Sequence, residues 1–531
     1  MSELLDRIDR LNEIGIALSA ESDTQKLLEI IMMGAKALTH ADGGSLYFFK
    51  DDVLTFEIIS NDSLDIQMGG TSGSKITFPP IPLMINGSEN HSNVVTHCVL
   101  SDKTINIEDA YHEDGFDFSG TRTFDTKTGY RTQSMLTIPL KDHEKEIIGV
   151  LQLINARDLN SRDVIAFNAI EQQLAESLAS QAAVALTQRR LISELQVLFE
   201  SFIKMIASAI DDKSPYTGGH CRRIPVLTMQ LAEAVDSTET GPLSGFCLSS
   251  NDRYELETAA WLHDCGKVVT PEYVMDKSTK LETICDRINL LEARIEVLLR
   301  DAEIAYLRSI VDTGNSNQAI SHQNYLDRCE QLKADLAFLQ QVNVGGEFLS
   351  DESRARIVEL SKASWVDASG RARPLITDDE LMNLSIQRGT LNDDERDIIN
   401  SHIVATIKML ESLPFPRNLQ NVPEYAGGHH EKMDGSGYPK GLKREEMSVQ
   451  ARIMAIADIF EALTARDRPY KEGKKLSECL KIMGFMKQDN HIDPDIFHIF
   501  VKNKVYLEYA EEFLDPEQID VIDEKLIPGY L

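Results

Sequence analysis

The sequence predicts a multidomain protein in which an α+β domain is followed by a long connecting helix and a larger region containing helical segments. A chain of 531 residues is too long for one hydrophobic core, because single domains usually have about 100–200 residues. Helix-like and strand-like patterns alternate over residues 25–158. Beyond them, apolar or small residues recur at steps of three and four between Phe167 and Met205, as in a heptad repeat. We therefore expect two or three domains.

The N-terminal α+β domain is expected over residues 1–166. Thr24 to Leu38 is apolar at helical spacing, whereas Gly44–Phe49, Leu54–Ile59 and Gly149–Ile154 alternate or run apolar like strands. The segment from Phe124 to Thr132, followed by Ser134-Met135-Leu136 and Pro139, resembles the GAF domains of cyclic-nucleotide phosphodiesterases. The resemblance implies a sensor domain. GAF domains often carry an Asn-Lys signature that is followed by Phe and then by Asp-Glu, and these residues do not follow Asn155-Ala156-Arg157-Asp158. The effector of the domain is therefore unknown.

Residues 167–205 are expected to form a signalling helix with an apolar seam. Two interpretations stay open: the helix packs on its own domain, or it pairs in parallel with a second copy and makes the protein a homodimer. We favour the homodimer, although glutamines at two seam positions weaken it. The seam comprises Phe167, Ile170, Leu174, Ser177, Gln181, Val184, Gln188, Leu191, Leu195, Leu198, Phe202 and Met205.

A second helical pattern predicts an insertion at about residues 281–388. One apolar stripe is separated from another by the turn-like segment 312–317. We expect a helical hairpin, followed by a mixed, loop-rich extension. The first stripe is Ile288, Leu291, Ile295, Leu298, Ala302 and Ala305, and the second is Leu326, Cys329, Leu336 and Leu339.

The charge and composition of the chain limit which partners it is expected to bind and in which compartment of the cell it is expected. The formal net charge of −31 would repel a nucleic-acid polymer, although a local basic cluster or a metal site can still hold a small phosphodiester. Met1 to Asp6 lacks the basic start of a signal peptide, and no apolar run approaches the roughly 18 residues of a membrane span. Seven cysteines are scattered without a framework spacing. We expect a cytoplasmic protein that does not enter the membrane.

Two histidine clusters carry the chemistry. His263-Asp264 lies where an apolar helical run approaches Gly266, and a helix end there would let both side chains serve one metal. His429-His430 precedes a Gly-Ser-Gly turn, and paired histidines in a packed core need partners for their ring nitrogens, which metal ligation supplies. Alone, the first pair fits structural hydrogen bonds equally well, and the second fits an ordinary polar loop.

The order of the motifs distinguishes these interpretations. His263-Asp264 with Gly266-Lys267, then His429-His430-Glu431 with Gly437-Tyr438-Pro439, then Ala457 to Thr464 and Arg468-Pro469-Tyr470, resemble the HD-GYP family. The resemblance covers roughly residues 206–280 and 388–500. It implies an all-α HD-GYP bundle over residues 206–515, interrupted by the insertion, with a metal centre in its core. It also implies hydrolysis of cyclic di-GMP to pGpG, and onward to GMP.

The resemblance implies a ligand set for two transition metals, iron or manganese, because imidazole and carboxylate donors suit those ions. Trinuclear members carry a Glu where this chain has Tyr216, so we expect two metals and not three. Glu461 stands where the family commonly has Asp, with no predicted consequence. The matching ligand positions are His220, His263, Asp264, His402, His429, His430 and Asp458.

Catalytic and substrate-binding roles follow from the same resemblance. Asp264 would bridge the metals, and Lys267 would contact the phosphate, unless it is only a solvated lysine at a helix end. Residues 440–475 hold nine basic against six acidic side chains, which suits a substrate with two phosphates or, equally, a solvated mixed-charge surface. Arg468 and Lys471 are the expected substrate contacts. The loop around Tyr438 is expected to recruit partner proteins.

Three alternatives remain. 3′,3′-cyclic GMP-AMP would use the same ligands and mechanism, so the metal centre does not distinguish it from cyclic di-GMP. A catalytically silent cyclic dinucleotide receptor is disfavoured because every expected ligand is retained. A general HD-superfamily nucleotide hydrolase would leave the second histidine cluster and the Gly437-Tyr438-Pro439 motif unexplained.

Overall fold

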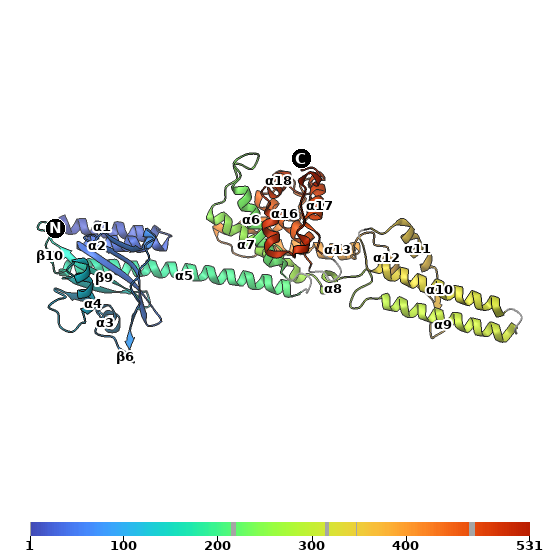
Figure 1. The fold of residues 1–531 in the computed structure, drawn as a ribbon, viewed down its shortest axis with the longest axis horizontal. Coiled ribbons are helices and arrows are strands. Elements are labelled where there is room, and N and C mark those ends of the chain that lie inside the picture. Colours follow the sequence, from blue (N-terminus) through green and yellow to red (C-terminus); the bar gives the residue numbers. More distant parts are fainter. Residues whose placement is uncertain (1, 214–218, 314–317, 347, 467–472, 531) are drawn as a thin grey trace. The chain divides into compact units, whose positions relative to one another are not determined.

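The computed structural model describes residues 2–213, 219–313, 318–346, 348–466 and 473–530. Tyr216, Arg468 and Lys471, for which roles are predicted, lie outside the described residues, as does most of the expected turn at 312–317. The chain divides into two compact units, Met1–Leu198 and Phe199–Leu531 (Figure 1). No helix in the described ranges combines the length and apolar character needed to cross a bilayer.

The N-terminal unit is built on an antiparallel sheet with the strand order β3-β2-β1-β9-β8-β7. The three strands expected from the sequence lie in β1, β2 and β9, so the α+β prediction is confirmed. The strands of this path are β1 (Ala41–Lys50), β2 (Val53–Asn61), β3 (Ile66–Gly69), β7 (Ile105–Ile107), β8 (Met135–Lys141) and β9 (Ile147–Arg157). Short strands are β4 (Ile81–Pro82), β5 (Met84–Ile85), β6 (Ser88–Glu89) and β10 (Val164–Ile165).

Helices cover both faces of this sheet (Figure 1). Successive residues of a strand point to opposite faces, so Leu46 packs in one apolar cluster and Tyr47 in another. The cluster of Leu46 includes side chains from α1 (Ser2–Ala20), α2 (Thr24–Thr39) and the start of α5 (Ala169–Lys213). The opposite face is covered by α3 (Val94–Ser101), and α4 (Ser119–Thr128) follows Phe118, which is buried on the same face.

The expected seam along α5 changes character along its length. Phe167, before the helix, and Leu174 are buried in the N-terminal core, so the first part packs on its own domain. Leu191, Leu195 and Leu198 are 45%, 64% and 51% exposed. The last turns are buried again, through Ile203, Ala207 and Ile210 in the C-terminal core. Local packing thus accounts for the two ends of α5 but not for the stretch between them.

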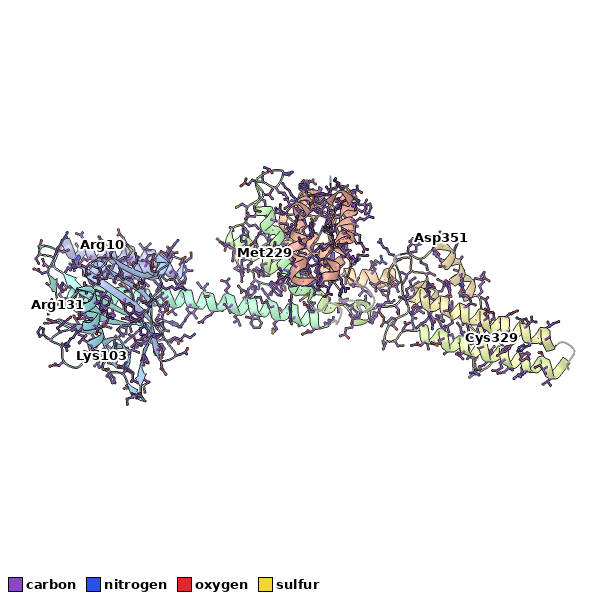
Figure 2. All side chains as sticks on the ribbon, viewed as in Figure 1. Arg10, Lys103, Arg131, Met229, Cys329 and Asp351 are labelled. Atoms are coloured by element: carbon purple, nitrogen blue, oxygen red, sulfur yellow. The ribbon has the colours of Figure 1, made fainter. Side chains whose placement is uncertain are left out.

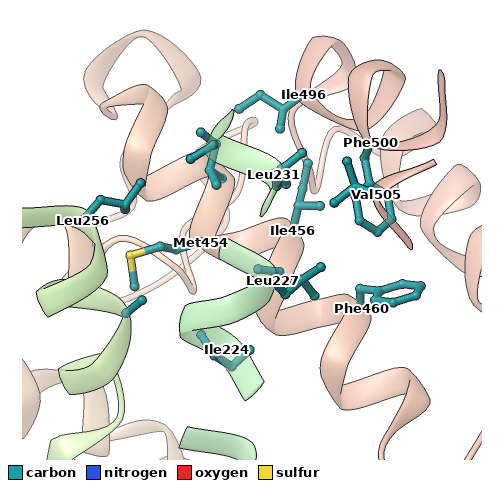
Figure 3. Packing of buried hydrophobic residues seen from close by; sticks show 14 of the residues in the cluster. Ile224, Leu227, Leu231, Leu256, Met454, Ile456, Phe460, Ile496, Phe500 and Val505 are labelled. Carbon is teal, nitrogen blue, oxygen red and sulfur yellow. The ribbon is translucent and has the colours of Figure 1, made fainter. Parts of the chain in front are cut away.

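The C-terminal unit is mostly helical, as predicted. Figure 3 shows its core, where Ile224, Leu227 and Leu231 of α6 lie against Ile456 and Phe460 of α16. These residues recur at helical spacing, which places them on one face of each helix. The helices of the bundle are α6 (His220–Asp236), α7 (Ser250–Leu262), α14 (His402–Glu411), α15 (Val422–Gly427), α16 (Val449–Thr464), α17 (Leu476–Gln488), α18 (Pro494–Lys502) and α19 (Val505–Phe513).

A helical hairpin with its own small core lies between α7 and α14 in the sequence. Leu291 and Ile295 pack with Leu339, whereas Ala305 and Leu326, expected in the same stripes, are exposed. Cys329 lies on the second hairpin helix (Figure 2) and, like the other cysteines, is free. The elements of this region are α8 (Glu272–Met275), α9 (Ile288–Thr313), α10 (Gln318–Asn343), α11 (Asp351–Ser361), β11 (Ser364–Val366), β12 (Ala372–Pro374), α12 (Asp378–Leu384) and α13 (Asp393–Asn400).

Candidate metal centre

The predicted ligand residues lie mostly at helix ends, where adjacent side chains can converge. His220 and His402 begin α6 and α14, His263 caps α7, and Asp458 lies within α16. His429 and His430 follow α15. The structure brings all seven predicted positions into one buried region of the bundle.

Gly266 has a different role from the one expected. Helix α7 ends at Leu262, before Gly266, which lies in a short 3₁₀ helix, Cys265–Val269. A Cβ atom at Gly266 would lie 2.0 Å from the carbonyl oxygen of His402 and 2.5 Å from the amide nitrogen of Thr406. Glycine is therefore required here because α14 approaches closely, and not because it terminates a helix.

One group of donors gathers around His220. Its Nε2 atom lies 3.2 Å from His263 Nε2 and 3.2 Å from Asp264 Oδ2. His263 Nε2 is also 3.2 Å from Asp264 Oδ2, and Asp458 Oδ1 is 3.5 Å from His220 Nε2. Four donor atoms of imidazole and carboxylate type thus face one another within ordinary ligand-to-ligand separations.

A second group gathers around His402. His430 Nε2 lies 3.2 Å from His402 Nε2, and His429 completes the group. Asp264 Oδ1 lies 3.2 Å from His402 Nε2, while Asp264 Oδ2 faces the first group. The two oxygens of one carboxylate therefore face the two histidine groups.

Hydrogen bonds fix the orientation of four of these rings. The Nδ1–H groups of His263, His402 and His429 donate to backbone carbonyls three residues earlier, at 2.8, 2.5 and 2.7 Å. His220 Nδ1–H instead donates to Glu461 Oε2 at 2.5 Å. A ring that donates through Nδ1 presents a bare Nε2, and such an outer partner is typical of metal-bound histidine.

Two atoms of the site are buried without a hydrogen bond. His429 Nε2 and Asp264 Oδ1 have no hydrogen-bond partner among the residues that the structure describes. Leaving a buried acceptor unsatisfied costs about 1–3 kcal/mol, so such atoms need an explanation. A cation at each group would satisfy both atoms, and the donor set therefore fits metal ions.

The protonation states of three of these groups agree with this fit. Burial, followed by the neighbouring ring of His263, lowers the pKa of His429 well below its ordinary value. Burial and then His429 lower the pKa of His430 to about 2. Burial alone would raise the pKa of Asp264, but Lys267 and His263 hold it well below its ordinary value. Neutral imidazole and ionised carboxylate are the forms that bind metals. For His220, burial lowers the pKa, but Glu461 and Asp264 outweigh burial and raise it to about 10, so a metal ion has to displace that proton.

Two side chains near the site were not recognised from the sequence. Arg223 donates to Glu461 Oε1 through Nε at 2.7 Å and Nη2 at 2.6 Å, which fixes the carboxylate that holds His220. Glu461 itself was noted only as a departure from the family pattern. No local pattern marks Arg223, because its partner lies 238 residues away in sequence.

Lys267 is within the site and is not a solvated helix-end lysine. Its Nζ atom lies 2.6 Å from Asp264 Oδ2, and its side chain is mostly buried. Although burial alone lowers the pKa of Lys267, the Asp264 carboxylate raises it above the ordinary value. An ammonium group therefore faces the same space as the histidines.

The loop containing Tyr438 is held against the second histidine group. The Tyr438 ring stacks on His430 with ring centroids 4.8 Å apart and an angle of 20°. Buried Glu431 accepts hydrogen bonds from the backbone amides of Lys440 at 2.7 Å and Leu442 at 2.9 Å. At Gly437, a Cβ atom would lie 2.4 Å from the amide nitrogen of Lys432, so only glycine fits this close approach.

The N-terminal unit contains a cavity of about 530 Å³, within the range of small-molecule pockets. Aromatic rings line much of it, including Tyr47, Phe56, Phe78 and Phe124. Gln152 adds an amide at its wall, and among the described lining residues there is no lysine, arginine or histidine. The cavity therefore offers stacking surfaces, neutral polar groups and the Asp117 carboxylate, and its described lining residues supply no cation.

Comparisons with known families agree with both units. A GAF domain model matches residues 23–186, and an HD domain model matches residues 376–496. The chain combines a GAF domain with an HD domain. HD domains are a family of metal-dependent phosphohydrolases, and the matched range contains His402, His429, His430 and Asp458. The match begins within the insertion, so the earlier ligand positions lie outside it.

Curated relatives of known name cover part of the chain. The chain is 36% identical over 147 residues to 3′3′-cGAMP-specific phosphodiesterase 1 of Vibrio cholerae, and this alignment covers 28% of the chain and 32% of that protein. The chain is 37% identical over 114 residues to a cyclic di-GMP phosphodiesterase of Pseudomonas aeruginosa, and this alignment covers 22% of the chain and 26% of that protein. The chain thus spans about a third or less of these relatives. The GAF domain of a Coxiella burnetii phosphoenolpyruvate-protein phosphotransferase matches 36% of this chain and 98% of its own at 13% identity and a TM-score of 0.28.

Proposed function

We propose that the HD domain, of the HD-GYP type, is a metal-dependent phosphodiesterase that hydrolyses cyclic di-GMP to pGpG and onward to GMP, under control of the GAF domain. The observation that carries the proposal is the pair of histidine groups with one Asp264 oxygen directed to each. The relatives named as cyclic dinucleotide phosphodiesterases support the substrate class. The complete ligand set argues against a catalytically silent receptor.

Two transition-metal ions, iron or manganese, fit this donor set. His220, His263 and Asp458 would hold one ion and His402, His429 and His430 the other, with Asp264 shared between them. When bound, such ions act as Lewis acids on a phosphodiester and lower the pKa of water. Dinuclear rather than trinuclear occupancy rests on Tyr216, a neutral phenol where a third site needs a carboxylate.

The protein's own groups complete the proposed chemistry. Asp264 is catalytic because each oxygen of its ionised carboxylate faces one histidine group and would hold the metal ion bound there. Lys267 is catalytic and substrate-binding because its ammonium lies in the same space and would stabilise negative charge on the phosphate. Arg468 and Lys471, which lie outside the described residues, remain proposed substrate contacts, and the Tyr438 loop a proposed surface for partner proteins.

The second candidate substrate is 3′,3′-cGAMP, favoured by the relative from Vibrio cholerae that is named for it. Metal-loaded protein should be incubated with equal concentrations of the two cyclic dinucleotides, and the linear products quantified separately. Faster production of pGpG supports cyclic di-GMP as the substrate. Faster opening of cGAMP would replace it, and turnover of neither would contradict the phosphodiesterase itself.

Contacts at the end of α5 support control through this helix. Asp211 accepts hydrogen bonds from the backbone amides of Gly219 at 3.1 Å and Cys221 at 3.2 Å, on either side of His220. Lys213 donates to three carbonyls that follow Asp264, those of Lys267, Val268 and Thr270. We propose that a movement of α5 alters the spacing of the first histidine group.

A homodimer would cover the exposed stretch of α5. Leu191, Leu195 and Leu198 recur at heptad-like spacing and are about half exposed or more, as a parallel helix pair requires. The cavity of the GAF domain is the proposed site for its effector, and its lack of cationic lining disfavours a phosphate group there. The proposed location is the cytoplasm, which the scattered, free cysteines support.

A further inference from the structure

The helical insertion begins and ends beside the proposed metal centre. It leaves the bundle after α8, which follows Asp264 in the sequence, and returns through α13, which precedes His402. At this root, Lys277 Nζ lies 2.7 Å from both carboxylate oxygens of Glu395. The Lys277 side chain is fully buried. One buried ion pair therefore joins the outgoing and returning segments.

Hydrogen bonds surround this pair. Asn383 Oδ1 accepts from Lys277 Nζ at 3.3 Å and from Asn392 Nδ2 at 3.1 Å. The hydroxyl of Thr390 donates to the carbonyl oxygen of Lys277 at 3.0 Å. A buried charge pair is tolerated only when its remaining donors and acceptors form hydrogen bonds, and this network provides those hydrogen bonds. The root is thus a closed polar junction between the two segments.

Glu395 connects the junction to the start of α13. Asn392 accepts a hydrogen bond from the Glu395 amide at 2.9 Å, and Glu395 Oε2 accepts one from the Asn392 amide at 3.0 Å, which forms a capping box. The last turn of the same helix contains Ile399, whose carbonyl accepts from His402 Nδ1–H. The short helix α13 therefore connects Lys277 to the orientation of the His402 ring.

We infer that Lys277 is a positioning residue for His402, acting through Glu395 and α13, so that the root of the insertion sets the geometry of the second histidine group. The inference rests on the proposed metal centre. The other account is that the pair only closes the root of the insertion and stabilises its fold. Under that account, breaking the pair changes unfolding but leaves metal binding unchanged.

The insertion contains a second ion pair of the same construction, which serves as a control. Arg294 Nη1 lies 2.7 Å from Glu380 Oε2 and 2.8 Å from the carbonyl oxygen of Leu375. Glu380 is the capping-box residue of α12, as Glu395 is of α13, and both carboxylates are largely buried. Among the described residues, none of α12 accepts a hydrogen bond from a histidine of the site, whereas Ile399 of α13 does. Helix α12 contacts the root through Asn383, which accepts from Lys277. The second pair therefore resembles the first in burial and capping but has no direct path to His402.

The test is a calorimetric titration of Mn²⁺ into the metal-free full-length chain. Lys277→Met with Glu395→Gln removes the ion pair and avoids leaving one buried charge unpaired, while Gln can still accept from the Asn392 amide. We expect binding at one of the two sites to weaken about tenfold or more, as for loss of a residue that orients a metal-bound histidine. Arg294→Met with Glu380→Gln is expected to bind within about twofold of wild type.

The outcomes separate the two accounts. Tight binding by a folded Lys277→Met, Glu395→Gln variant, or equal weakening in both double variants, overturns the inference. Should that variant fail to fold, Asn383→Ala keeps the ion pair but removes its shared acceptor, and about fivefold weaker binding is expected. Unchanged binding by Asn383→Ala also overturns the inference. A wild-type chain that binds no Mn²⁺ instead contradicts the proposed metal centre itself.

Discussion

Glu461 offers a sharp test of how the protein prepares its metal centre. Its carboxylate accepts the Nδ1–H of His220 at 2.5 Å and is itself fixed by Arg223. A hydrogen bond to a charged group contributes about 1.5–3 kcal/mol, which corresponds to about a tenfold to hundredfold change in an equilibrium constant. Loss of an outer carboxylate partner of a metal-bound histidine has an effect of the same size. Glu461→Gln should therefore weaken Mn²⁺ binding by about tenfold or more.

The assay is again Mn²⁺ titration of the metal-free chain, with thermal unfolding followed in parallel. Glu461→Asp is the matched control, because it keeps the charge with one methylene less and restores the residue that is common in the family. We expect it to bind metal more tightly than Glu461→Gln. If Glu461→Gln bound Mn²⁺ within about twofold of wild type while remaining folded, the reasoning from the His220 contact would be refuted.

Three other outcomes are expected. Asp264→Ala should reduce hydrolysis to background, and a rate above about a tenth of wild type, a barrier change of only about 1.4 kcal/mol, would contradict its shared role. Replacing Leu191, Leu195 and Leu198 with glutamate should give monomers by light scattering, with altered turnover; a monomeric wild-type protein would count against the dimer. Burial lowers the pKa of Lys280 from 10.5 to about 8, so the unfolded chain binds more protons between those values, and urea stability should rise with pH there relative to Lys280→Met. If the urea stabilities of the wild type and of Lys280→Met changed equally with pH over this range, the lowered pKa of Lys280 would be contradicted.

The fold was largely predictable because its signals are local. The alternating pattern of Leu54–Ile59 and the helical spacing of Thr24–Leu38 are properties of short segments, and both elements form as expected. The packing of the apolar seam on α5 was harder to predict, because the exposure of each seam residue depends on which other part of the fold covers that turn of the helix. Leu174 and Leu195 occupy equivalent positions in the pattern, yet one is buried in the GAF domain and the other is 64% exposed.

The site was predictable where motifs carry it and not where distant contacts do. The positions of His220, His402 and Asp458 followed from an ordered set of family motifs, and the structure brings these residues together. Contacts between distant segments leave no comparable pattern. The sequence around Gly266 predicts a helix end there. The contact of Gly266 with Thr406, which is 140 residues away, leaves no pattern in the sequence and could not be predicted. The division into domains at residues 166, 205 and 515 stays a prediction.

Two transition metals held by the two histidine groups are proposed to support hydrolysis of a cyclic dinucleotide. The most direct measurement combines elemental analysis of purified full-length protein with turnover of cyclic di-GMP before and after chelation. We predict close to two iron or manganese ions per chain, activity that chelation removes, and recovery when the metal is restored. Three metals per active chain, or full activity after complete metal removal, would contradict the account.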